Sequence, residues 1–255
     1  MEVVQVQDLW KRFRIPHEKR TTILENLAGY LQVLGGRRFT YEEFWALKGV
    51  SFAIKSGQSM GIIGENGSGK STLLRLIARI LRPDKGIVKT HGTIAPILEL
   101  GLGFHGDLTV TENALVYGTI MGLRRRELKK RMDSILEFSG IERFRDAKLK
   151  NLSSGMQMRL AFAVAIETDP DIFLIDEALA VGDMEFGQKC LAKFREFKSN
   201  GKSLVLVSHA LGLVKDFCEN AILLSRGEIV ALGNVQDVID EYVRQVKAKA
   251  IPQTQ

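Results

Sequence analysis

A glycine-rich segment constrains the fold of this chain more than any other feature. Residues 64–72 read GENGSGKST and fit the pattern GxxxxGK[ST]. The apolar run 60–63 before them predicts a buried strand, and residues 70–80 have helical spacing. A strand, this loop and a helix in that order predict a phosphate-binding loop in an α/β protein. A glycine-rich turn that matches by chance is the plainer alternative.

The residue types of this loop indicate what it binds. Glycines let the backbone curl so that successive N–H groups point at phosphate oxygens, and the helix start adds partial positive charge. We expect Lys70 to reach the β- and γ-phosphates of a nucleotide and the Ser71 hydroxyl to ligate Mg²⁺. The predicted nucleotide-binding residues of the loop are Gly64, Asn66, Gly67, Ser68, Gly69, Lys70, Ser71 and Thr72.

Two acidic residues follow a second apolar run. Residues 172–175 are continuously apolar, as expected of a strand buried on both faces, and Asp176 and Glu177 come directly after them. Phosphoryl transfer needs a carboxylate that holds Mg²⁺ and a group that activates water. We expect Asp176 to take the first role and Glu177 the second. Without the phosphate loop, two surface acids would be the better interpretation.

A third segment precedes a helix that we expect over residues 153–167. The sequence LSSGMQ at residues 152–157 places Ser153 at the N-cap. Backbone N–H groups at such a start can bind a γ-phosphate, so Ser153, Ser154 and Gly155 are candidate ligand-binding residues. Taken alone, the hexapeptide favours a capped helix with no ligand.

The rest of the chain indicates a soluble α/β protein interrupted by helices. Predicted helices at 184–198 and 210–217 alternate with an apolar run at 204–207, which favours a parallel sheet. The middle of the chain, about 111–167, is expected to be helical, with helical periodicity at 111–122, 126–138 and 153–167. Hydrophobic residues make up 45% and charged residues 26%, which excludes wholesale disorder. A net charge of +6 suits an anionic ligand, lipid headgroups or nucleic acid without choosing among them.

Neither membrane spans nor metal-binding cysteines are expected. The longest apolar run, residues 160–166, is far shorter than the roughly 20 residues that span a bilayer. Cys190 and Cys218 lack metal-ligand spacing, so we expect two reduced thiols in or near the core.

Together with Ser208 and His209, these motifs stand in the order and spacing of an ABC transporter ATPase subunit. LSSGMQ resembles the signature motif LSGGQ of that family, and His209 resembles its switch histidine. The resemblance implies an ABC ATPase domain over residues 1–246, with a tail or linker at 247–255. It implies an α/β fold: an ABC-type P-loop nucleotide-binding domain with a parallel-sheet core, an antiparallel β region and a helical subdomain at about 108–168.

The same resemblance assigns roles at the site. It implies ATP and Mg²⁺ as ligands, with Glu177, His209 and Lys70 catalytic, Phe13 stacking on adenine, and Ser71, Asp176 and Glu99 at the metal. Glu99 stands where most relatives have glutamine. The two half-sites would lie on opposite sides of one protomer, so a head-to-tail homodimer would enclose two ATP molecules between the phosphate loop of one chain and Ser153, Ser154 and Gly155 of the other.

A subfamily is also indicated. LELGLGFH at residues 98–105, LTVTEN at 108–113 and an insertion at 21–47 are similar to polysaccharide exporters, which move O-antigen, capsule or teichoic acid. This implies the motor subunit of an ABC exporter for lipid-linked polysaccharide, O-antigen first. It would act peripherally at the cytoplasmic face of the bacterial inner membrane with an integral-membrane permease and no nucleic acid. The alternatives are a teichoic acid or capsule exporter and a non-transport ABC ATPase.

Two further segments have open interpretations. The insertion at 21–47 combines an apolar helical stretch, Arg37, Arg38 and the aromatic residues Tyr41, Phe44 and Trp45. It either contacts the lipid-linked glycan or packs on the core, with Phe44 and Trp45 extending a strand. The basic run at 124–131 is either a solvated helix face or a surface attracted to anionic lipid.

Overall fold

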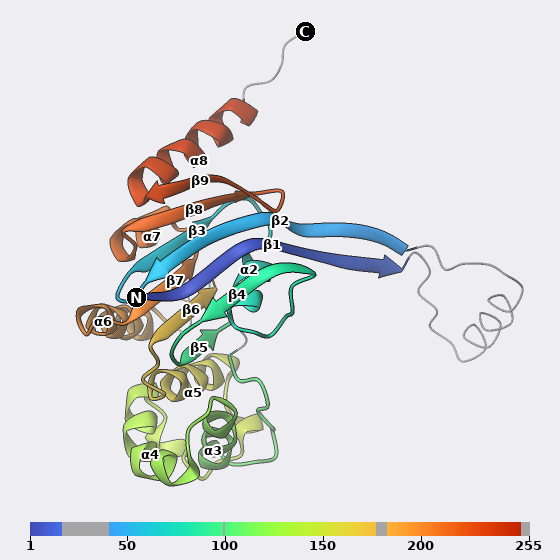
Figure 1. Ribbon diagram of the computed structural model, residues 1–255. Coiled ribbons are helices and arrows are strands. Elements are labelled where there is room, and N and C mark those ends of the chain that lie inside the picture. Colours follow the sequence, from blue (N-terminus) through green and yellow to red (C-terminus); the bar gives the residue numbers. More distant parts are fainter. Residues whose placement is uncertain (17–40, 99, 177–182, 251–255) are drawn as a thin grey trace, which may run out of the picture.

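Two sheets and a group of helices make up the computed structural model, which describes residues 1–16, 41–98, 100–176 and 183–250 (Figure 1). The first sheet is antiparallel and has the order β2-β1-β4. Its strands are β1 (Glu2–Pro16), β2 (Tyr41–Lys55) and β4 (Lys85–Thr90). Beyond the body of the molecule, β1 and β2 continue as a long two-stranded arm (Figure 1).

The second sheet is the parallel core and has the order β5-β6-β7-β3-β8-β9. Its strands are β3 (Ser59–Ile63), β5 (Ile94–Ile97), β6 (Ile172–Asp176), β7 (Ser203–Val207), β8 (Asn220–Ser225) and β9 (Glu228–Asn234). Only β9 pairs antiparallel to its neighbour, through the hairpin with β8. Every residue of β3 and β7 is buried, because layers of side chains cover both faces of the sheet.

Different side chains cover the two faces of this core sheet. A cluster of aliphatic residues, among them Val4, Leu73 and Ile62, fills the space between the two sheets and α2 (Lys70–Ile77). A phenylalanine-rich cluster packs the other face, against α6 (Met184–Ser199), α7 (Leu211–Phe217) and α8 (Val235–Ala250). Both clusters hold the carboxyl ends of β3 and β6 in place.

The helical group has a hydrophobic cluster of its own. It consists of α3 (Val110–Ile120), α4 (Arg125–Ser139) and α5 (Ser154–Ile166), with 3₁₀ turns at Glu142–Phe144 and Leu149–Asn151. Buried residues of all three helices form that cluster, and α5 lies nearest the core sheet (Figure 1). These helices fall within the stretch at 108–168 expected to form a helical subdomain.

Several expected elements differ in extent. The helix expected over 70–80 ends at Ile77 because Arg79 adopts a left-handed φ of 60°, and the amide of Ile80 bonds back to the carbonyl of Arg75 at 2.9 Å. Helix α8 continues to Ala250, so it includes the first residues of the expected tail.

The plainer interpretation of the insertion has Phe44 and Trp45 extending a strand. Both residues do lie in the long strand β2. The apolar stretch at 23–34, Arg37 and Arg38 lie outside the described residues, so the remainder of that interpretation stays a prediction.

Candidate nucleotide-binding site

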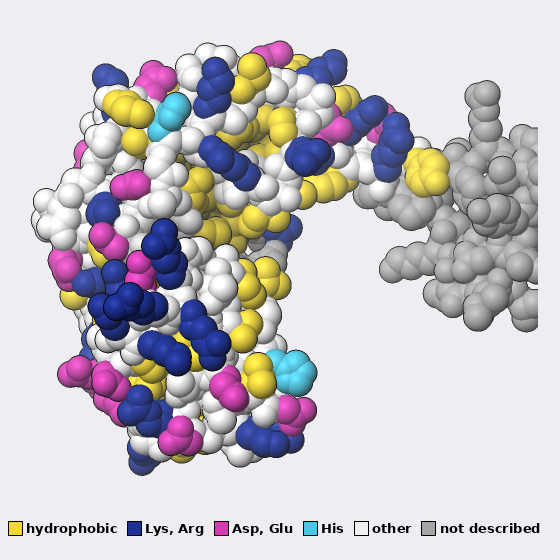
Figure 2. All heavy atoms as spheres, turned by 60° about the horizontal axis from the view of Figure 1, so that its bottom comes forward, with side chains coloured by type: hydrophobic (Ala, Val, Ile, Leu, Met, Phe, Trp, Pro, Cys, Tyr) yellow, Lys and Arg dark blue, Asp and Glu magenta, His cyan; other side chains and the backbone are white. Residues whose placement is uncertain are grey.

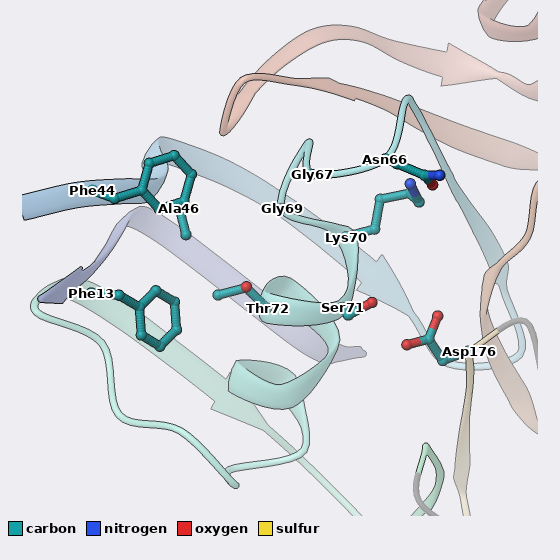
Figure 3. Close-up of a pocket in the computed structure, with 10 residues that line it drawn as sticks. All are labelled: Phe13, Phe44, Ala46, Asn66, Gly67, Gly69, Lys70, Ser71, Thr72 and Asp176. Atoms are coloured by element: carbon teal, nitrogen blue, oxygen red, sulfur yellow. The ribbon is translucent and has the colours of Figure 1, made fainter. Parts of the chain in front are cut away.

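A hollow of about 590 Å³ opens at the carboxyl ends of β3 and β6 (Figure 3). Its lining consists of Phe13, Phe44, Ala46, Asn66, Gly67, Gly69, Lys70, Ser71, Thr72 and Asp176. Phe44 and Ala46 were not predicted, and all the others were. Residues from four separate parts of the sequence therefore meet at one place, which is where ligands bind in open parallel sheets.

Close packing makes glycine necessary at two positions of the loop. Gly64 has φ 150° and Gly69 has φ 108°, in the region of backbone conformation that favours glycine. A Cβ at Gly64 would lie 2.1 Å from the carbonyl oxygen of Leu224, and one at Gly69 would lie 2.6 Å from that of Ala46. The loop therefore packs tightly against neighbouring backbone segments, and this packing fixes its curvature.

Lys70 lies inside this curvature. Its side chain is 5% exposed, and its Nζ donates to the carbonyl oxygens of Gly64 and Glu65, both at 2.9 Å. Helix α2 begins at Gly69 with no side-chain cap and no acidic residue in its first turn. A buried ammonium beside an uncapped helix start creates positive potential, which suits a phosphate group.

Oxygen donors stand at one end of the hollow. Ser71 lies in the first turn of α2 and Asp176 ends β6, and their side-chain oxygens lie on the same side of the helix start (Figure 3). A hydroxyl and one carboxylate, completed by phosphate oxygens and water, form a donor set that Mg²⁺ accepts. Glu99 and Glu177 fall outside the described residues, so their roles stay predictions.

Two phenylalanines stand at the other end. Phe13 and Phe44 are cross-strand partners in the β1–β2 ladder, and both rings lie on the hollow's side of this sheet (Figure 3). They are 38% and 49% exposed, so both rings are accessible from the hollow. Stacking of a base on an aromatic ring contributes roughly 1–3 kcal/mol. The pair is therefore a candidate surface for a nucleobase, and the stacking role expected of Phe13 stays a prediction.

Other predicted residues lie outside the lining of this hollow. Gly64 and Ser68 form the back of the loop, where the Ser68 hydroxyl is buried with no hydrogen-bond partner among the described residues. His209 is exposed just after β7, the strand between β6 and β3. It thus stands at the same carboxyl edge of the sheet as Asp176.

The signature segment starts a helix elsewhere on the chain. Ser153 is the N-cap of α5, and its hydroxyl accepts a hydrogen bond from the amide of Met156 at 3.2 Å. Ser153 and Ser154 are exposed, and neither they nor Gly155 line the hollow. The chain on its own does not bring these residues to the phosphate loop.

One link at α5 was not predicted. Arg159, in the second turn of α5, forms an ion pair with Asp183 at 2.5 Å, and Asp183 caps α6 by accepting from the amide of Phe186 at 3.0 Å. The Phe186 amide and the Arg159 guanidinium together hold the pKa of Asp183 below its usual range. Arg159 thereby ties the signature helix to the start of α6, a contact for which the sequence carries no periodic signal.

The comparisons with known proteins agree with this geometry. Residues 47–180 match the ABC transporter family. The O-antigen export system ATP-binding protein RfbB of Myxococcus xanthus is 43% identical over 246 residues, which are 95% of this chain and 56% of that protein. RfbB of Klebsiella pneumoniae is 41% identical over 83% of this chain and 84% of its own length. The chain belongs to the ABC transporter family.

Other relatives and solved structures extend the comparison. The teichoic acids export ATP-binding protein TagH of Listeria monocytogenes serotype 4b is 43% identical over 81% of this chain and 61% of its own length. The solved ATP-binding subunit of an ABC transporter superposes with a TM-score of 0.72 at 20% identity, covering 97% of this chain and 98% of that one. A dimeric ATP-binding cassette bound to ADP and Pi gives 0.68 at 24% identity, with 91% and 98% covered.

These matches confirm the predicted family and fold class. The chain spans little more than half the length of the Myxococcus protein and about three fifths of the listerial one. Among the described residues, the helices are all too short or too polar to cross a membrane.

Proposed function

We propose that this chain is the ATP-binding and hydrolysing motor subunit of an ABC exporter that moves lipid-linked polysaccharide across the cytoplasmic membrane. One observation carries the proposal: the phosphate loop, Asp176 and the Phe13–Phe44 pair line a single hollow. A nucleoside triphosphate needs a base platform at one end, an anion cradle in the middle and oxygen donors for a cation at the other. The hollow supplies the three in that order (Figure 3).

The chain's own residues then have separate tasks. The loop amides and Lys70 hold the phosphates, while Glu177 orients or deprotonates the attacking water. Ser71 and Asp176 would hold Mg²⁺, which when bound neutralises charge on the phosphate oxygens. His209, at the same edge of the sheet, would sense the terminal phosphate, and the amides of Ser154 and Gly155 would approach it from the other side.

A second copy of the chain is needed for that last contact. Ser153, Ser154 and Gly155 do not line their own chain's hollow. A head-to-tail homodimer would bring them to the partner's phosphate loop, and the similar cassette with ADP and Pi is described as dimeric. The active unit that we propose therefore contains two chains and two nucleotides.

The cargo follows from the named relatives. We place O-antigen first, since the Myxococcus O-antigen export protein aligns over 95% of this chain, and teichoic acid second, since a teichoic acid export protein is equally identical over 81%. Such a motor would act at the cytoplasmic face of the bacterial inner membrane with an integral-membrane permease.

An apolar hollow offers a place for that permease. It measures about 290 Å³ and lies between β5, the segment after α2 and helix α3. Ile80, Leu102 and Ile120 line it and are each more than half exposed. A short apolar helix from a membrane partner would cover these side chains, and movement of α3 would then be transmitted to that helix.

The proposal is tested in two stages. The purified chain should hydrolyse ATP in the presence of Mg²⁺, and it should co-purify with a membrane permease rather than with ribosomes or DNA. Complementation of a strain that lacks its O-antigen export ATPase, set beside a strain that lacks its teichoic acid export ATPase, then separates the two cargoes. If the chain hydrolyses ATP but co-purifies with no membrane permease, the proposed transport role is wrong and the nucleotide site remains.

A further inference from the structure

A second hollow with a charged lining lies at the opposite end of α2 from the phosphate loop. It measures about 560 Å³ and is formed by the end of α2, the segment that follows it and strand β4. Its floor includes the apolar side chains of Leu76 and Val88, and its charged lining consists of Arg79, Arg82, Lys89 and His91. None of these residues lines the nucleotide hollow.

The charge of this hollow is not compensated within the described structure. No Asp or Glu is among its lining residues. Lys11, Arg12 and Lys150, by contrast, have carboxylate partners at 3.2 Å or less. The neighbouring acid Asp84 is engaged by Lys11 and by the backbone amide of Arg12. Three permanently charged residues and a histidine therefore line one space, and no carboxylate of the described residues lines it.

Backbone strain at one of these residues indicates that its side chain is needed. Arg79 has a φ of 60° at the end of α2, a position where glycine is the usual residue. Its guanidinium donates to the carbonyl oxygen of Thr90 at 2.7 Å, which fixes it across the gap between α2 and β4. A guanidinium has further N–H donors in a rigid plane, a geometry that matches phosphate oxygens.

Strand β4 adds backbone donors. It lies at the edge of its sheet, with β1 as its only neighbour among the described strands. The Thr90 carbonyl points away from β1 toward Arg79, and the amide of the same residue points the same way. An edge amide beside a fixed guanidinium is a common way to hold an oxyanion.

We propose that this hollow is an anion site that binds a phosphate group and is separate from the nucleotide site. Free pyrophosphate and the headgroup of an anionic lipid share this chemistry. Ile80 lies between Arg79 and Leu81 and lines the neighbouring apolar hollow. If that apolar hollow meets the permease, as the proposed function has it, the anion site faces the bilayer side, which favours a lipid headgroup.

The first experiment uses pyrophosphate as the probe and the chain saturated with ADP, so that the phosphate loop is occupied. The chain has four histidines, of which His91 lies in the anion site and His209 near the nucleotide site. NMR of their imidazoles reports both places at constant ionic strength. We expect pyrophosphate to shift His91 in a saturable way once calorimetry shows that ADP is bound.

Variants tie the response to the hollow. Arg79→Gly suits the left-handed backbone and should fold normally, and Arg82→Ala with Lys89→Ala removes two further charges. Each lost charge-assisted contact should weaken pyrophosphate binding roughly tenfold. The matched control is Lys189→Ala with Lys215→Ala, exposed lysines of α6 and α7 that do not line the hollow, which should bind as the parent chain does.

The second experiment distinguishes the source of the phosphate. Vesicles of phosphatidylcholine with phosphatidylglycerol are compared with pure phosphatidylcholine for the parent chain, the hollow variants and the control on α6 and α7. Loss of vesicle binding in the hollow variants alone assigns a lipid headgroup, whereas loss of pyrophosphate binding alone assigns a free phosphate. Equal binding of both probes by hollow variants and control would overturn the site. Failure of the chain to bind ADP in calorimetry would instead count against the nucleotide site.

Discussion

Helices α2 and α5 both begin in segments that contain glycine and serine, yet the starts of the two helices differ in capping and in burial. Helix α2 begins at Gly69 with no side-chain cap, inside a loop where Lys70 is buried. Helix α5 begins at Ser153, whose hydroxyl caps the amide of Met156, and its first residues are exposed. The first start lines a hollow of its own chain, whereas the second does not.

The difference shows how one chain can carry half of a binding site that only another molecule completes. An uncapped helix start in a concave, positive setting gains its partners from a phosphate group. A capped start is stable without a ligand, and its cap uses only the third amide of the helix, leaving those of Ser154 and Gly155 without described acceptors. The start of α5 therefore suits a phosphate group that is already bound to another molecule.

The largest expected effect comes from Glu177→Gln. Glutamine keeps the shape of the side chain and removes the base, so ATP hydrolysis should fall roughly 10²–10⁴-fold while nucleotide binding persists. The start of α2 in one chain and the start of α5 in its partner would then both stay bound to the same unhydrolysed ATP. Sedimentation should therefore detect a trapped dimer. The comparison between the two starts depends on that dimer.

Its control is Glu185→Gln, an exposed acid in the first turn of α6 that lies outside the hollow. This variant should hydrolyse ATP at the parent rate. Near-normal turnover in Glu177→Gln would remove the role assigned to that carboxylate, and a monomer at saturating ATP would remove the shared site.

The next effect concerns the first helix start alone. Lys70→Ala removes the buried ammonium that lies beside the phosphates, so ATP affinity should fall about 10- to 100-fold in calorimetry. Lys129→Ala takes away the same charge from an exposed position of α4 and serves as its control. Unchanged affinity in Lys70→Ala would show that the uncapped amides bind the phosphates unaided.

Sequence reasoning found this first helix start because its constraint is local. The glycines and Lys70 act within a few residues, so spacing alone predicts their arrangement. Phe44 was missed because its position depends on the pairing of two strands more than 25 residues apart, in which it faces Phe13. A predicted β1–β2 hairpin would have supplied that register.

Two strands were missed for physical reasons of their own. Strand β5 contains Pro96, which usually argues against a strand, but β5 lies at the edge of the core sheet, where the missing N–H is tolerated. Strand β4 follows a turn, and its residues are mostly exposed, so it has little apolar pattern. The early end of α2 depends on a non-glycine left-handed residue, Arg79, which no helix rule anticipates.

A smaller effect tests the second helix start. Ser153→Ala removes the cap and should lower the free energy of unfolding by about 1 kcal/mol. Ser153→Asp keeps a capping oxygen but adds negative charge, so it should retain stability and lose ATP hydrolysis by repelling the partner's nucleotide. ADP affinity of the single chain should stay unchanged in both variants. Weaker ADP binding in either would mean that Ser153 acts within its own chain.

The smallest expected effect is a pH dependence of stability. It concerns the ion pair between Arg159 of α5 and Asp183 at the start of α6. The amide of Phe186 and the guanidinium of Arg159 hold the pKa of Asp183 below its usual range. The resulting stabilisation is present above the ordinary aspartate pKa of about 4 and is lost as pH falls through the lower folded value. Asp183→Asn keeps the cap but not the charge, so it should melt below the parent at about pH 6 and approach it under acidic conditions. A melting difference that stays constant with pH would show that the carboxylate charge does not stabilise the junction of α5 and α6.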